Sequence, residues 1–152
     1  MKVEIKKEQF DPWQELVDYK RSQLHNNPKI GASSVFLGIM RDFNDDETIS
    51  SMELEYYPDM TEKYLTKIVN DAIKKFKIVD GLVIHRVGLL TPTDPIVLVA
   101  TWSEHRENAF NATREIMESL KSEAPFWKKE STDKGFRWVE PKNQKEENVN
   151  GS

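Results

Sequence analysis

Apolar residues recur every three to four positions over two long segments of this chain, and each recurrence predicts an amphipathic helix. The first helix is predicted to begin at Pro58-Asp59 and to continue to Phe76. Asp59 and Glu62 have the spacing of a capping box, which would satisfy free backbone N–H groups of the first turn. We expect this helix to be a structural part of the core.

The second segment covers residues 103–125. Ser103 is a good N-cap residue, and Pro125 cannot continue a helix. The apolar stripe between them consists of Ala109, Phe110, Thr113, Ile116, Met117 and Leu120. His105 and Arg106 fall in the predicted first turn, where unpaired N–H groups and the helix dipole favour an anion. Because a basic pair has no capping role there, this turn is a candidate anion site.

A shorter helix is predicted near the N-terminus. Asp11 suits the N-cap, and Pro12 suits the first helical position, where its missing N–H costs nothing. We expect the buried face of this helix to consist of Trp13, Leu16, Val17 and Leu24.

Alternating or continuous apolar runs predict the strands between these helices. The strands cover residues 2–10, 30–41, 49–57, 82–87 and 96–102, and a hairpin follows at 126–131 and 136–141. Gly31 and Gly38 lie inside the second strand, where a glycine often marks a bulge or a close approach by another backbone. The order of elements predicts an α+β fold with three main helices and a mixed, largely antiparallel sheet.

Length and composition agree with an ordinary globular protein. The chain has 152 residues, a net charge of −4 and no cysteine. We assign residues 1–141 to a single domain and expect the polar residues 142–152 to form a disordered tail. The absence of cysteine excludes disulfides, thiolate metal ligands and a cysteine nucleophile. Because no segment has the pattern of a membrane span or a signal peptide, the expected location is the cytoplasm.

Several classes of site find no support in the sequence. It contains neither a glycine-rich phosphate loop nor a His-x-x-x-His pair for zinc, so we expect no metal site. His85 lies inside a predicted strand, where a histidine is more often a hydrogen-bonded structural residue than a catalyst. What remains is a set of basic residues, namely Arg41, His105, Arg106, Lys121, Lys128 and Arg137. Each alone is best explained as a surface charge, but together they suit a phosphate or carboxylate ligand.

The spacing within this set has a consequence. His105 and Lys121 are 16 positions apart, which corresponds to roughly 24 Å along a straight helix. Either they belong to different sites, or a second copy of the chain brings its His105-Arg106 end to the Lys121-Lys128 end of the first. The second alternative predicts a homodimer with composite sites.

Six stretches of the chain resemble the large, catalytic subunit of molybdopterin synthase. They are GASSVFLGIMRDFN (31–44), LEYYPDMTEK (54–63), VIHRVGLL (83–90), SEHRENAF (103–110), LKSEAPFWKKE (120–130) and RWVE (137–140). They keep the order and spacing of that family over most of residues 30–140. The resemblance implies the family's fold, of α/β hammerhead type.

The resemblance also implies a sulfurtransferase of molybdenum cofactor biosynthesis that uses no metal or other cofactor. In this family a small ubiquitin-like subunit carries a C-terminal thiocarboxylate, and its sulfur is transferred to cyclic pyranopterin monophosphate (precursor Z). Two transfers form the dithiolene of molybdopterin. The implied assembly is a heterotetramer, a homodimer of the large subunit with one small subunit at each end. No nucleic acid or membrane partner is implied.

The resemblance assigns roles residue by residue. Lys121 and Lys128 match the catalytic lysines. Arg41, His105 and Arg106 match substrate-binding residues, with the His-Arg pair contributed by the neighbouring subunit.

Three further positions match the substrate pocket of the family. Phe36 and Met117 match apolar positions, although either is equally explained as core. Lys142 stands where a basic residue, often arginine, closes the pocket from the partner subunit, so the charge is kept while the bidentate fork is lost. The loop Thr93-Asp94-Pro95 also departs from the family pattern, which leaves its conformation open.

Two other classes of function compete with the enzyme. A non-catalytic adaptor that only docks a ubiquitin-like tail would not need Lys121 or Lys128, and both are present. A phosphate-ligand or RNA-binding domain would need a wide basic face, which the acidic net charge disfavours.

Overall fold

The computed structural model of the chain describes residues 1–139. Within this range there are three α-helices: α1 (Pro12–Tyr19), α2 (Pro58–Phe76) and α3 (Arg106–Glu123). A π-helical segment, Lys20–Leu24, extends α1 by about one turn. None of these helices is both long enough and apolar enough to cross a membrane.

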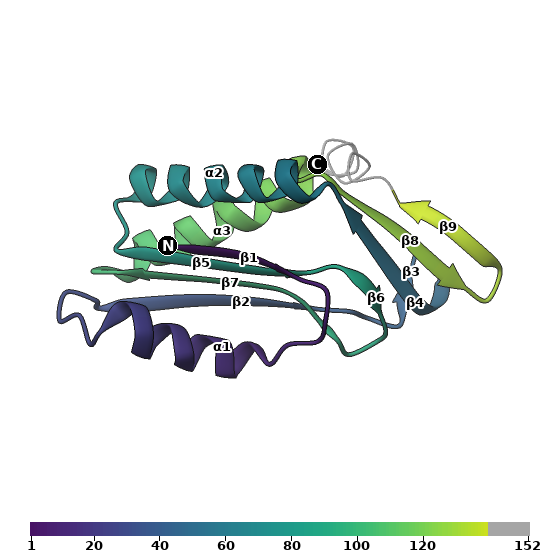
Figure 1. Ribbon diagram of the computed structural model, residues 1–152, viewed down its shortest axis with the longest axis horizontal. Coiled ribbons are helices and arrows are strands. Elements are labelled where there is room, and N and C mark those ends of the chain that lie inside the picture. The colour runs from purple at the N-terminus through teal and green to yellow at the C-terminus, as the bar shows by residue number, and fades with distance from the viewer. Residues whose placement is uncertain (140–152) are drawn as a thin grey trace.

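A four-stranded sheet forms the centre of the molecule. Its strand order is β1 (Lys2–Lys6), β5 (Asp80–Arg86), β7 (Pro95–Ser103) and β2 (Ala32–Ile39). Only the β1–β5 pair is parallel. Helix α1 covers one face of this sheet, and α2 and α3 cover the other (Figure 1). Each face therefore has its own apolar core.

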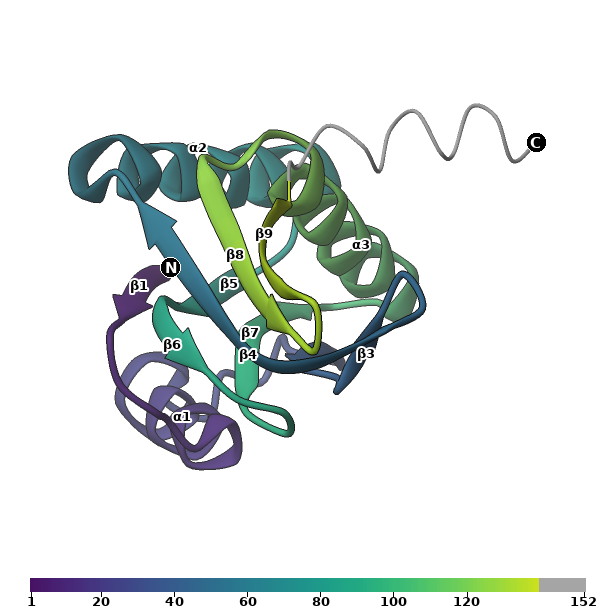
Figure 2. The same ribbon diagram turned by 90° about the vertical axis from the view of Figure 1, so that its right-hand side faces the viewer.

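A second sheet lies at one end of the first (Figures 1 and 2). Its strands are β3 (Phe43–Asn44), β4 (Glu47–Tyr56), β8 (Phe126–Thr132) and β9 (Gly135–Val139), with β6 (Gly88–Leu90) also paired to β4. The pairs within this sheet are all antiparallel.

The predicted α+β class is confirmed, with three helices and mixed, largely antiparallel pairing. The strands are divided between two sheets, whereas we expected one. Strands β3 and β6 were not expected, because two or three residues are too few to show a periodic pattern. The predicted disordered tail and Lys142 lie outside the described residues.

Helices α1 and α2 begin at Pro12 and Pro58 as predicted, but only one of the three predicted N-caps is correct. Asp11 caps α1 as predicted, and its carboxylate accepts hydrogen bonds from the N–H groups of Trp13 and Gln14. The Asp59–Glu62 capping box is wrong: Pro58 is the first helical residue, so the N-cap is Tyr57, which makes no side-chain bond. Ser103 as an N-cap is also wrong, because β7 continues through it and α3 begins only after His105.

The predicted buried faces need two corrections. In α1, Trp13 and Val17 are 62% and 42% exposed, because the face that meets the sheet carries Pro12 and Tyr19 instead. Tyr19 stacks on Trp102 of β7, with the ring centroids 5.3 Å apart. In α3, Phe110 is 60% exposed, while the rest of the predicted stripe is buried.

Candidate functional site

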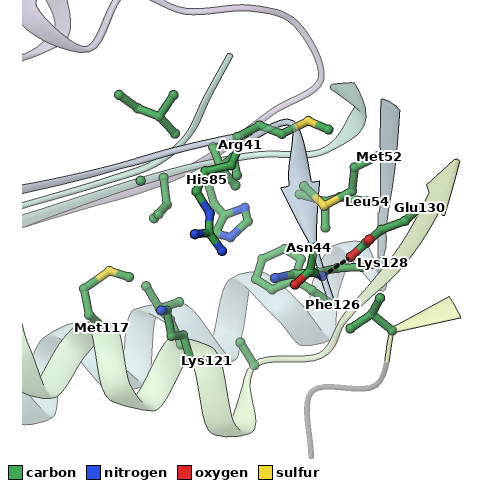
Figure 3. Close-up of a pocket in the computed structure, with 18 of the residues that line it drawn as sticks. Arg41, Asn44, Met52, Leu54, His85, Met117, Lys121, Phe126, Lys128 and Glu130 are labelled. Atoms are coloured by element: carbon green, nitrogen blue, oxygen red, sulfur yellow. Dashed lines mark hydrogen bonds between the residues drawn. The ribbon is translucent and has the colours of Figure 1, made fainter. Parts of the chain in front are cut away.

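A pocket of about 440 Å³ lies where the end of β2 meets the second sheet and the C-terminal part of α3. This volume is in the range of small-molecule sites. Figure 3 shows its basic side chains converging from different elements: Arg41 follows β2, Lys121 lies on α3 and Lys128 lies on β8. We call it the cationic pocket after these three residues.

Five of the residues proposed from the sequence line the cationic pocket. They are Phe36, Arg41, Met117, Lys121 and Lys128. Their sequence separation spans most of the chain, so the fold brings them together. His105 and Arg106 are not among the lining residues; they lie at the opposite end of α3 from Lys121. The unbroken helix puts Arg106 roughly 22 Å from Lys121 along its axis.

A hydrogen-bonded loop holds the segment that carries Arg41. The pairing of β2 with β7 shifts register between Gly38 and Ile39. Beyond this bulge the N–H of Met40 donates to the carbonyl of Asp94 at 2.9 Å, and the N–H of Thr93 donates to the carbonyl of Met40 at 2.9 Å. Thr93 has a φ of 79°, which is unusual for a residue other than glycine. The departure at Thr93-Asp94-Pro95 is therefore an ordered turn that anchors the residue before Arg41.

Helix α3 presents Met117 and Lys121 one turn apart on the same side. Met117 is 8% exposed and belongs to the main core cluster as well as to the pocket lining. Lys121, in the last turn, is exposed. Met117 is thus part of the core contacts of α3, and these contacts hold the helix turn that carries Lys121 beside the pocket.

At the other end of α3 the chain turns tightly against β2. The N–H of Gly31 donates to the carbonyl of Ser103 at 2.9 Å. A Cβ at Gly31 would lie 2.3 Å from the carbonyl oxygen of Glu104, so only glycine fits. The prediction that a glycine here marks a close approach by another backbone is confirmed. This contact fixes the turn that precedes His105.

Side chains alternate between the two faces of strand β8, and this alternation places Lys128 in the pocket. Phe126, Lys128 and Glu130 line the pocket. Lys129 points to the other face of the sheet, where its ammonium group lies 4.8 Å from the ring centroid of Phe136. Two adjacent lysines therefore face different surroundings.

Lys128 has an environment that disfavours its charge. Burial lowers the pKa of the Lys128 ammonium, and the positive charge of Lys121 lowers it further, while Glu130 opposes both effects. A lysine whose pKa is lowered in this way carries a larger neutral fraction, which can act as a base or a nucleophile.

Glu130 links the pocket to the β3–β4 hairpin. Its carboxylate accepts hydrogen bonds from the Asn44 amide at 2.8 Å and from Arg137 at 3.1 Å (Figure 3 shows the first). Arg137 also donates to the carbonyl of Asn44 and pairs with Glu47. Arg137, which we considered as an anion ligand, is thus engaged in holding this hairpin.

His85 is a lining residue that the sequence did not assign to the site. It is 8% exposed and stacks on Phe126, with centroids 4.0 Å apart and an interplanar angle of 16°. Burial and the nearby charge of Lys128 lower its pKa to about 4, so the ring is neutral at pH 7. The expectation of a hydrogen-bonded strand histidine is confirmed, but its position in the pocket could not be seen from periodicity.

The arrangement suits an anionic ligand. Three cations converge on a partly apolar cavity, where electrostatic interactions are stronger than in water. Among residues 1–139, no group of three or more Asp, Glu or His side chains is placed to hold a metal ion.

A family model and individual relatives of known name both match this chain, and they indicate the same family. Residues 5–123 match the family described as MoaE protein. The chain is 58% identical over 113 residues to the molybdopterin synthase catalytic subunit of Ralstonia nicotianae, an alignment that covers 74% of this chain and 64% of that protein. It is 45% identical over 141 residues to the molybdopterin synthase catalytic subunit of Pseudomonas aeruginosa, covering 92% and 91% of the two chains.

Solved structures share the fold. The molybdopterin biosynthesis MoaE protein of Burkholderia ambifaria superimposes with a TM-score of 0.76 at 44% identity, over 92% of this chain and 89% of that one.

Proposed function

This chain belongs to the MoaE protein family, and we propose on that basis that it is the catalytic subunit of a molybdopterin synthase. Its reaction is the transfer of sulfur from the C-terminal thiocarboxylate of a small ubiquitin-like subunit to cyclic pyranopterin monophosphate. Two transfers produce the dithiolene of molybdopterin. The protein is a sulfurtransferase of molybdenum cofactor biosynthesis, and we place its reaction in the cytoplasm.

The observation that carries this proposal is the convergence of Arg41, Lys121 and Lys128 on one pocket. Both reactants are anionic, since one carries a cyclic phosphate and the other a thiocarboxylate. Cations fixed in a partly buried site attract both and stabilise the negative charge that builds up when the acyl carbon is attacked. A metal is not needed for this stabilisation.

Lys121 and Lys128 have different roles in this account. Lys121 is exposed and supplies a positive charge at the thiocarboxylate. Lys128 is more buried and has a lowered pKa, so it is the better candidate for acid, base or nucleophile. Phe36 and Met117 form apolar walls that limit water near the reacting atoms.

We propose that the site is completed by a second copy of this chain. His105 and Arg106 lie roughly one helix length from Lys121, so a single chain cannot bring both ends to one small ligand. A homodimer that places the His105-Arg106 end of one chain at the cationic pocket of the other would supply them. With one small subunit per pocket the assembly is a heterotetramer. Lys142 would close the same pocket from the partner subunit.

A non-catalytic adaptor for a ubiquitin-like tail is the second candidate. Such a protein needs a groove for the tail but gains nothing from a buried lysine, whose desolvation costs stability. The lowered pKa of Lys128 therefore favours the enzyme.

Reconstitution tests the proposal. The purified chain is mixed with a thiocarboxylated small subunit and cyclic pyranopterin monophosphate, and molybdopterin is measured after conversion to its fluorescent oxidation product. The enzyme predicts product, and conversion of the small subunit's thiocarboxylate to a carboxylate by mass spectrometry. A small subunit ending in an ordinary carboxylate is the control and must give no product. Binding of the small subunit without any molybdopterin would favour the adaptor.

A further inference from the structure

His85 occupies the cationic pocket without a role in the reaction described above. It is buried on β5, and Figure 3 shows its ring projecting into the pocket. The lysines and Arg41 account for the anionic parts of a ligand. These three residues do not explain how an uncharged part of the ligand would be recognised.

The hydrogen bonding of His85 defines its tautomer. Nδ1 lies 2.8 Å from the carbonyl oxygen of Arg86. A carbonyl can only accept, so Nδ1 carries the proton and donates it. In the neutral ring the other nitrogen, Nε2, is then an acceptor with a free lone pair. The lowered pKa keeps the ring in this form at neutral pH.

The ring is held in place by its contacts. Phe126 stacks against one face at 4.0 Å between centroids, and the Nδ1 bond ties one edge to the backbone. A side chain fixed at both a face and an edge does not pay a large entropy cost when a ligand binds to its remaining edge.

Nε2 differs from the other polar groups of the pocket. Arg41 and the ammonium forms of Lys121 and Lys128 are donors only. The carboxylate of Glu130 already accepts from Asn44 and Arg137. Among the side chains that line the pocket, two nitrogen or oxygen acceptors receive no hydrogen bond from residues 1–139: Nε2 of the buried His85 and Oδ1 of the half-buried Asn44. Of these two, only Nε2 belongs to a residue of the pocket interior.

We propose that His85 is a specificity-determining residue, whose Nε2 accepts a hydrogen bond from an N–H or O–H group on the heterocyclic part of the substrate. The proposal rests on the proposed function, since it takes the substrate to be the pterin phosphate. The three cations bind the anionic groups of the substrate, and His85 accepts a hydrogen bond from an uncharged donor on its ring system. An analogue that lacks this donor would leave Nε2 desolvated and unpaired, which is costly in a buried site.

Three substitutions separate the functions of the ring. His85→Phe keeps an aromatic ring that can stack on Phe126, although a larger one, and removes both nitrogens. His85→Asn keeps a donor near the position of Nδ1 and removes the distal acceptor. His85→Gln keeps an acceptor near the position of Nε2. His25→Gln, at an exposed position outside the pocket, is the matched control.

The experiment measures the Kd for cyclic pyranopterin monophosphate by calorimetry, and the thermal midpoint of each variant, with the full chain. We expect His85→Phe and His85→Asn to weaken binding about 10- to 100-fold, and His85→Gln to restore it to within about threefold of wild type. Midpoints should stay near that of wild type for every variant that keeps its fold. If His85→Phe does not fold, the Kd of His85→Asn still tests whether the distal acceptor is needed.

Two outcomes would overturn the proposal while leaving the proposed function intact. One is a wild-type Kd in His85→Phe or His85→Asn. The other is equal weakening in all three variants together with lowered midpoints, which would make His85 purely structural. A wild-type chain that neither binds the pterin phosphate nor forms molybdopterin would instead overturn the proposed function, and this inference with it.

Discussion

The ammonium group of Lys121 lies close enough to that of Lys128 for its charge to lower the pKa of Lys128. The two residues come from α3 and β8, so this coupling depends on how the helix packs against the second sheet. The protonation of the more buried Lys128 therefore depends on the charge of the exposed Lys121.

Replacing Lys121 by glutamine should raise the pKa of Lys128. The substitution removes a nearby like charge and leaves the burial of Lys128 in place. NMR titration of the labelled lysine side chain measures the shift. Lys129→Gln is the control, because Lys129 points to the opposite face of β8. Equal shifts in both variants would show that the effect is not specific to Lys121.

Lys128→Met should stabilise the protein and abolish its activity. The lowered pKa means that the fold disfavours the ammonium, so an apolar side chain of similar length removes a desolvation cost. We expect the free energy of unfolding to rise by about 1 kcal/mol, measured by urea denaturation. A loss of stability would mean that the charge of Lys128 is well compensated in the folded protein.

Acidification should reveal the buried neutral ring of His85. The pKa of His85 is about 4 in the folded state, against an ordinary value of 6.5. Between these two pH values the unfolded chain therefore binds a proton at this histidine and the folded chain does not. Its contribution to stability is therefore fully present above pH 6.5 and is lost as the pH falls towards 4. Between pH 7 and pH 4.5 the wild type should lose about 2–3 kcal/mol more than His85→Phe does. Urea denaturation at the two pH values measures the difference. Equal losses would contradict a neutral buried His85.

Mixed dimers test the composite site. His105→Ala and Lys121→Ala chains should each be poorly active, and a heterodimer of the two should recover one intact pocket out of two. Activity of up to about half that of wild type is expected, since one pocket would contain both substitutions and the other neither. Tandem affinity purification with two tags isolates the heterodimer. No rescue in verified heterodimers would place His105 and Lys121 in different sites.

Much of the site could be predicted from the sequence, because its cations lie in specific motifs. Arg41, Lys121 and Lys128 were selected by type and pattern, and the fold places them in one pocket. The separation of His105 from Lys121 followed from helix geometry alone. Residue type and helix geometry are local properties, whereas the placement of these three cations in one pocket is a tertiary property, and we expected it only from the family resemblance.

The misses have tertiary causes. Trp13 is exposed although it lies on the apolar side of its helix. Periodicity shows which side of a helix is apolar, but it does not show which side packs against the sheet. Ser103 is a residue type that favours an N-cap, but pairing with Ala32 extends β7 through it. His85 was discounted because a strand pattern does not reveal that Phe126 and a cavity meet it from distant elements.

The most direct measurement of the central claim is single-turnover formation of molybdopterin by the wild type, Lys121→Ala and Lys128→Ala. Binding of the small subunit is measured in parallel, and Lys74→Ala, exposed on α2, is the control. We predict that both pocket variants bind the small subunit but form product at least about 100-fold more slowly, and that the control matches wild type. Near wild-type rates in either pocket variant would remove that lysine from the mechanism, and in both would contradict the account.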